Sequence, residues 1–114
     1  LYMLGGRLHD RWRFSDGKRE QGISVKGDRV SDDADVVRRW AVSGAGLVYK
    51  SWLDVAGDVR AGRLQVLLPE LRGEPTPLNL ICTHRAQLSK PVLLLREFVQ
   101  LRCTELLADA PWPN

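Results

Sequence analysis

The strongest constraint on the fold is an alternation of helix-like and strand-like stretches between residues 31 and 68. Residues 31–43 and 51–62 carry apolar side chains at the spacing of an amphipathic helix. Residues 46–50 and 63–68 are shorter and apolar, as in strands buried within a sheet. Helices that alternate with strands cover the faces of a sheet, so the sequence predicts an α/β fold.

A β-hairpin is predicted ahead of this alternation. Residues 12–14 and 22–26 alternate in polarity in the manner of strands, with Ile23 and Val25 on one face. Residues 15–18 between them form a turn, because the glycine there adopts the positive φ of tight turns without strain. The hairpin adds antiparallel pairing, so we expect a mixed sheet flanked by helices.

The ends of the two central helices carry residues that favour helix initiation and termination. Ser31 and Ser51 are placed to cap the first free backbone N–H groups. Gly44 and Gly62 follow the helices and favour their termination. In the first helix, acidic side chains near the start and arginines near the end complement the helix dipole.

The C-terminal part of the chain is predicted to hold a loop, a strand and a long helix. The loop spans residues 69–77 and the strand residues 78–84. Residues 90–107 form the helix, with Ser89 as its cap and a proline where a missing N–H costs little. We expect residues 108–114 to be a frayed tail.

Composition excludes several classes of protein. The chain of 114 residues is 44% hydrophobic and 27% charged, which is typical of one globular domain and not of a disordered chain. Its net charge of +3 is spread along the sequence, so there is no basic stripe for nucleic acid. The longest apolar run, residues 92–95, is too short to span a membrane. Because Cys82 and Cys103 lie far apart and no secretory signal is present, we expect free thiols and a cytoplasmic location.

No group of residues predicts catalysis or metal binding. Cys82 and His84 share a strand face, but a structural metal needs about four ligands and no others can be named. Asp32 and Asp33 are adjacent and do not converge on one point of a helix, which argues against acid–base chemistry. The two capping serines lack a nucleophile elbow and a histidine partner. We therefore expect no enzyme activity, no cofactor and no metal site.

The chain resembles one family of transcription factors. The resemblance rests on four motifs: W-x-F, G-x-G-[IL], G-[RK]-L-v-x-v-L-P, and a Ser-x-Pro opening of the last helix. They stand at residues 12–14, 44–47, 62–69 and 89–91. Their order and spacing are similar to the effector-binding domain of LysR-type transcriptional regulators. The sequence departs from the usual pattern at residues 50–52, where Lys-Ser-Trp replaces Leu-Pro, so the resemblance does not identify the effector.

The resemblance implies half of a two-lobed domain of the periplasmic-binding-protein-like (type 2) kind. On this basis residues 1–114 are a partial effector-binding domain. Its second lobe spans about 1–77, the return hinge strand 78–84 and the C-terminal helix about 90–107. The resemblance also implies a small-molecule effector as partner, and DNA binding only through a winged helix-turn-helix that is not present in this chain.

Candidate effector-binding residues lie where the two central helices begin. Ser31 and Asp32 stand at the start of the first helix, and Tyr49, Lys50 and Ser51 stand at the start of the second. Free N–H groups at helix N-termini attract anions, and Lys50 adds a positive charge. We therefore expect these residues to line one wall of an effector cleft and to favour a carboxylate.

Two other functions are compatible with the sequence. One is a small α/β enzyme domain, against which the absence of a nucleophile and base pair argues. The other is an oligomerisation fragment that binds no ligand. Association is expected in any case, because the last helix has an apolar arc wider than one sheet would cover, made of Leu94, Leu95, Phe98, Val99, Leu101 and Leu106. We expect a homo-oligomer.

Overall fold

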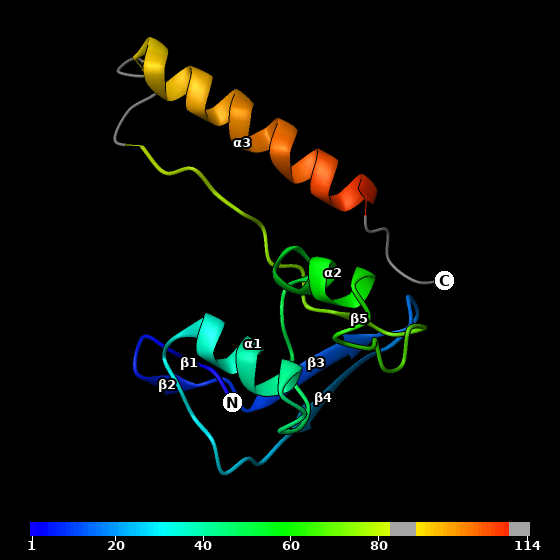
Figure 1. Ribbon diagram of the computed structural model, residues 1–114. Helices are drawn as coiled ribbons and strands as arrows, with labels where there is room; N and C mark the ends of the chain where they lie inside the picture. The colour runs from blue at the N-terminus through cyan, green and yellow to red at the C-terminus, as the bar shows by residue number, and fades with distance from the viewer. Residues whose placement is uncertain (83–88, 110–114) are drawn as a thin grey trace.

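The computed structural model describes residues 1–82 and 89–109, in which small antiparallel sheets are combined with helices (Figure 1). In chain order the elements are β1 (Met3–Leu4), β2 (Arg7–Leu8), β3 (Arg11–Ser15), β4 (Glu20–Ser24), α1 (Ala34–Val42), α2 (Trp52–Arg60), β5 (Arg72–Gly73) and α3 (Lys90–Asp109). None of the helices among these residues is long and apolar enough to cross a membrane.

The predicted hairpin is confirmed as β3 and β4, which pair antiparallel with Trp12 opposite Ile23. Its turn is closed by Asp16, whose Oδ1 accepts hydrogen bonds from the backbone N–H groups of Lys18 and Arg19, both at 2.8 Å. The short strand β5 pairs antiparallel with the other edge of β3, which gives the order β4-β3-β5. Parallel pairing in the described residues is confined to a bridge between Tyr2 and Ser31.

Helix α1 is confirmed, but its predicted cap is wrong. The N-cap is Asp33, whose Oδ1 accepts from the backbone N–H groups of Asp35 at 2.8 Å and Val36 at 3.3 Å. Ser31 lies two residues earlier, where its Oγ accepts from the N–H of Asp33 at 3.0 Å. Its backbone pairs with the start of the chain, which holds Ser31 outside the helix. Gly44, with φ of 79°, follows the helix as expected.

Helix α2 begins and ends close to the predicted positions. Ser51 is its N-cap residue, although its side chain makes no capping hydrogen bond. Ala61 is the C-cap, and Gly62 follows it with φ of 70°, a conformation that favours glycine.

Three predicted strands are not formed in the described residues. Residues 46–50, 63–68 and 78–82 have no strand pairing, and Leu47 remains 74% exposed. The physical reason is that the free edge of β3 is taken by β5, which lies inside the predicted 69–77 loop. Leu68, with φ of 55°, also interrupts extended backbone. The end of the third predicted strand, from residue 83, lies outside the described residues.

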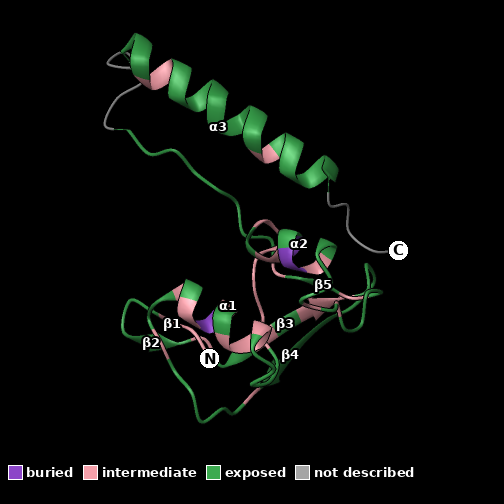
Figure 2. Cartoon of the chain, in the orientation of Figure 1, coloured by how far each residue is buried: buried purple, intermediate pink, exposed green. Residues whose placement is uncertain are grey.

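Helix α3 is confirmed and continues two residues beyond the predicted end, to Asp109. Residues 108 and 109 are therefore helical and not part of a frayed tail, while 110–114 lie outside the described residues. No residue of α3 is buried (Figure 2). It stands at the end of the extended segment that follows β5, and its last turn approaches α2, where Arg60 Nη1 lies 3.7 Å from Asp109 Oδ2.

The core of the described residues is small and contains a charge. Val37 of α1 and Ala56 of α2 are buried, together with Asp58 of α2, which is only 4% exposed. Asp58 accepts from Arg63 Nε at 2.8 Å and from Arg38 Nη1 at 2.5 Å. These hydrogen bonds, from Arg63 and then Arg38, hold the pKa of Asp58 below its ordinary value although burial acts in the opposite direction. Asp58 therefore connects α1 to α2.

We expect Asp58→Asn to lower the free energy of unfolding by about 1–3 kcal/mol at neutral pH, because two arginines lose their charged acceptor. The folded pKa of Asp58 lies below the unfolded value of about 3.9, so its stabilisation is present above that pH and is lost as pH falls through the folded value. The difference between wild type and variant in urea unfolding should thus shrink below about pH 4. Asp32→Asn, at an exposed position, serves as the control; an equal effect of both substitutions would contradict the role of Asp58.

Candidate functional site

The candidate site centres on Tyr49, whose hydroxyl lies between two strands. It donates a hydrogen bond to the carbonyl oxygen of Arg13 at 2.7 Å and accepts one from the N–H of Glu74 at 2.5 Å. The register of β3 and β5 pairs Phe14 with Gly73, so Arg13 and Glu74 would form the next pair. The Tyr49 hydroxyl therefore takes the place of a direct backbone hydrogen bond and ends the β3–β5 ladder.

Aromatic rings hold Tyr49 in this position. Trp12 stacks on it with ring centroids 5.4 Å apart and an interplanar angle of 21°. Phe14 meets it edge-on, and His9 lies tilted at 5.6 Å. Burial raises the pKa of the Tyr49 hydroxyl above its ordinary value, so the group stays protonated and donates at neutral pH.

Glycine and glutamate of the β5 segment complete the cluster. A Cβ atom at Gly73 would lie 2.6 Å from the Tyr49 hydroxyl oxygen, so only glycine permits this close approach. The Glu74 carboxylate lies 3.3 Å from Arg13 Nε and 3.6 Å from His9 Nε2. The segment after β5 is thus attached to β3 by one inserted hydroxyl and by charge pairs.

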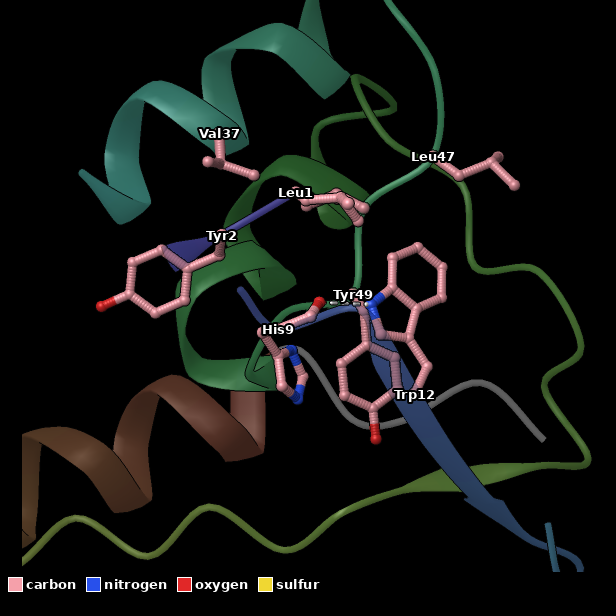
Figure 3. Close-up of a pocket in the computed structure, with 8 residues that line it drawn as sticks. Leu1, Tyr2, His9, Trp12, Val37, Leu47 and Tyr49 are labelled. Carbon is pink, nitrogen blue, oxygen red and sulfur yellow. Dashed lines mark hydrogen bonds between the residues drawn. The ribbon is translucent and has the colours of Figure 1, made fainter. Parts of the chain in front are cut away.

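A shallow, open hollow lies beside Tyr49 (Figure 3). Its lining is mostly apolar and aromatic: Leu1, Tyr2, His9, Trp12, Val37, Leu47, Val48 and Tyr49. In Figure 3 Tyr49 lies against Trp12, whereas the hydroxyl of Tyr2 points away from them.

Of the predicted effector-binding residues, only Tyr49 lines the hollow. Lys50 is next to it, but its side chain is only 8% exposed, lies over the Tyr2 ring and pairs with Asp54 Oδ2 at 2.7 Å. Ser31 is bridged to the backbone of Tyr2, so Tyr2 connects Ser31 to Lys50.

The remaining two predicted residues lie outside this group. Asp32 is exposed, and Ser51 marks the start of α2 without lining the hollow. The structure therefore gathers part of the predicted site around Tyr2 and does not form a single wall from all of it.

The sequence analysis missed several residues that contact Tyr49. Trp12 was placed on the hairpin, and its alternation with Arg13 indicated a buried face without indicating a partner. His9 and Glu74 lie far apart in the sequence and match no motif, so no local signal would have found them. Only the pairing of β5 with β3 brings them together.

Potential metal ligands and catalytic side chains lie apart within residues 1–82 and 89–109. No three His, Cys, Asp or Glu side chains gather there as metal ligands. Both cysteines are free, Cys82 being exposed and Cys103 partly buried. The hydroxyl of Ser31 accepts from the Asp33 backbone, and the imidazole of His9 faces Glu74, so no serine and histidine are paired in this region.

The family model described as the LysR substrate binding domain matches residues 1–104. The chain belongs to this family. Members have a periplasmic-binding-protein-like α/β fold, and the described sheets and helices agree with that class. The recognition made from the sequence motifs is confirmed.

Curated relatives from Escherichia coli K12 are transcriptional regulators and not enzymes. The regulator DmlR is 27% identical over 89 residues, covering 78% of this chain and 29% of DmlR. The activator TtdR is 31% identical over 62 residues, covering 54% of this chain and 20% of TtdR. The activator AaeR is 31% identical over 72 residues, covering 60% of this chain and 23% of AaeR. The chain thus spans less than a third of each relative, and no solved structure matches it.

We expect Tyr49→Phe to lower the free energy of unfolding by about 1–2 kcal/mol, because the Arg13 carbonyl and the Glu74 N–H lose their shared partner. Hydrogen exchange at the Glu74 amide should accelerate more than exchange in α1. Tyr2→Phe is the matched control, since the Tyr2 hydroxyl makes no hydrogen bond within the described residues. Unchanged Glu74 exchange in Tyr49→Phe would refute the inserted hydroxyl.

Proposed function

We propose that this chain is the effector-sensing part of a LysR-type transcriptional regulator and that it binds a small molecule at the Tyr49 hollow. The observation that carries the proposal is the family match over residues 1–104. The hollow supports it, because it is the concave surface at which aromatic and polar side chains of the described region converge.

A small aromatic carboxylate is the ligand class that this surface fits best. The rings of Trp12 and Tyr49 offer an apolar stacking surface. Next to it, Ser51 marks the start of α2, where the helix dipole favours an anion. Lys50 supplies positive charge there, shared with Asp54. Ser31 and Asp32 remain in the proposal as the more distant part of the same wall.

The proposal includes a division of the chain. Residues 1–77 would form the second lobe of a two-lobed domain, residues 78–84 the return hinge and α3 the C-terminal helix. The exposure of α3 supports this division, because an apolar helix of this length requires a covering partner. DNA binding would belong to a winged helix-turn-helix elsewhere in a longer regulator, and the regulator would act in the cytoplasm.

A ligand-free oligomerisation fragment is the second candidate, and it is favoured by one observation. Apolar side chains of α3 are exposed over more than one face of the helix: Leu94, Leu95, Phe98, Val99, Leu101, Leu106 and Leu107. Burial of one such side chain contributes about 1.5–3 kcal/mol, so a few of them are enough to hold two copies together. Ligand binding distinguishes the two candidates.

We expect benzoate, as a probe aromatic carboxylate, to shift the backbone amide resonances of residues 48–52 in a titration followed by NMR. Tyr49→Ala should weaken this binding at least about tenfold, which corresponds to about 1.4 kcal/mol. Ser51→Ala should weaken it less, because the dipole of α2 remains. Ser24→Ala, on the exposed strand β4, is the control. Absence of any shift across a panel of aromatic and aliphatic carboxylates would leave the oligomerisation fragment as the better function.

We further expect the 114-residue chain to associate at micromolar concentration through α3. Replacing Leu94, Phe98 and Leu101 by Gln should lower the mean mass seen by light scattering coupled to size exclusion. Because these side chains are exposed, the change should leave the melting temperature of the remainder nearly unaltered. Arg96→Gln on the same helix is the control, and a wild-type chain that runs as a clean monomer would contradict this expectation.

A further inference from the structure

Strand β4 forms an outer edge of the three-stranded sheet, and all five of its residues are exposed. Two hydrogen bonds at the ends of the β3–β4 pairing show which residues of β4 are hydrogen-bonded to β3. The N–H of Val25 donates to the Asp10 carbonyl at 2.7 Å, and the N–H of Asp16 donates to the Arg19 carbonyl at 3.3 Å. Hydrogen-bonded pairs alternate in an antiparallel ladder, so the odd-numbered residues of β4 bond to β3.

The even-numbered residues Glu20, Gly22 and Ser24 therefore direct their backbone N–H and carbonyl groups away from β3. No backbone group within the described residues bonds to them on this side. A strand edge of this kind is a template for pairing with another strand.

We propose that β4 pairs antiparallel with β4 of a second copy of this chain, about a two-fold axis at Ile23. In this register Glu20 of one copy lies opposite Lys26 of the other, twice per dimer. Gly22 lies opposite Ser24, and Ile23 faces its own symmetry mate. The outward groups of residues 20, 22, 24 and 26 become hydrogen-bonded, and two three-stranded sheets join into one.

The charge sequence selects this register over its neighbours. Lys18, Lys26 and Asp28 lie just beyond the ends of β4. With the pairing extended to them, moving the axis to Gly22 brings Lys18 opposite Lys26, and moving it to Ser24 brings Glu20 opposite Asp28. Both alternatives place like charges in direct opposition, which destabilises cross-strand pairs. Of these three registers, only the one centred on Ile23 places opposite charges across from each other and brings the two isoleucines together.

Side-chain size and exposure agree with this arrangement. Gly22 and Ser24 are small, and the flexible Arg11 side chain lies over Gly22 on their face of the sheet, so the second strand would approach beside this side chain. Ile23 is 49% exposed and lies opposite Trp12 on the other face, beside the aromatic cluster. Contact with its symmetry mate would extend that apolar surface across the axis. This interface is separate from the Tyr49 hollow and from α3, and it does not depend on the ligand.

Disulfide trapping tests the register directly, in a chain whose own cysteines are replaced by Cys82→Ser and Cys103→Ser. At the two-fold axis, the Cα atoms of residue 23 would lie about 4.5 Å apart, a separation that a disulfide spans. Ile23→Cys should therefore form a covalent dimer rapidly under mild oxidation. Gln21→Cys should not, since its symmetry mate would be roughly 13 Å away. Mixing Gln21→Cys with Val25→Cys chains should restore cross-linking, because these two positions face each other.

Charge exchange tests the same pairing without cysteines, in the chain whose α3 carries Gln at positions 94, 98 and 101. Glu20→Lys or Lys26→Glu alone should raise the dimer dissociation constant about tenfold, because two like-charge pairs replace two ion pairs. The double exchange should return it to within about threefold of the parent value. Equal cross-linking by all single cysteine variants, or a dissociation constant insensitive to the charge exchange, would overturn the proposal and place association at α3 alone.

Discussion

The hydroxyl of Tyr49 is the contact on which the arrangement of the described region depends most. It joins the Arg13 carbonyl to the Glu74 N–H, and so attaches the segment after α2 to the hairpin formed more than thirty residues earlier. The cluster around it depends on Gly73, because a Cβ atom there would lie only 2.6 Å from the hydroxyl oxygen. The same side chain lines the hollow that we assign to the effector. One residue therefore contributes both to strand attachment and to the proposed recognition surface.

The charge of Asp58 plays a comparable part for the helices. Arg38 on α1 and Arg63 after α2 both donate to its buried carboxylate. Among the described residues, only Val37 and Ala56 are apolar side chains of comparable burial. A core this small stabilises little by apolar burial alone, so a fully hydrogen-bonded carboxylate has a large relative weight. The apolar side chains of α3 are exposed and do not add to this core, so they are available for contact with another chain or domain.

Membership in the LysR substrate binding domain family and the geometry of the hollow are complementary sources of information. The family indicates that regulators of transcription carry this domain, while the chain covers less than a third of each curated relative. The geometry adds which side chains are available to a ligand. It moves emphasis from Lys50, whose charge is shared with Asp54, toward the rings of Trp12 and Tyr49.

The sequence by itself determined the local elements. Alternating polarity and a turn glycine specified the hairpin, and helical spacing specified α1, α2 and α3, because each of these depends on neighbours within a few residues. The motifs at residues 44–47 and 62–69 sufficed for the family, but they did not fix strands there. A strand requires a free partner edge, and the edge of β3 was taken by β5 and by the Tyr49 hydroxyl. Only the tertiary structure decided this, together with the burial of Asp58 and the meeting of His9 with Glu74, because such contacts join residues that no local pattern relates.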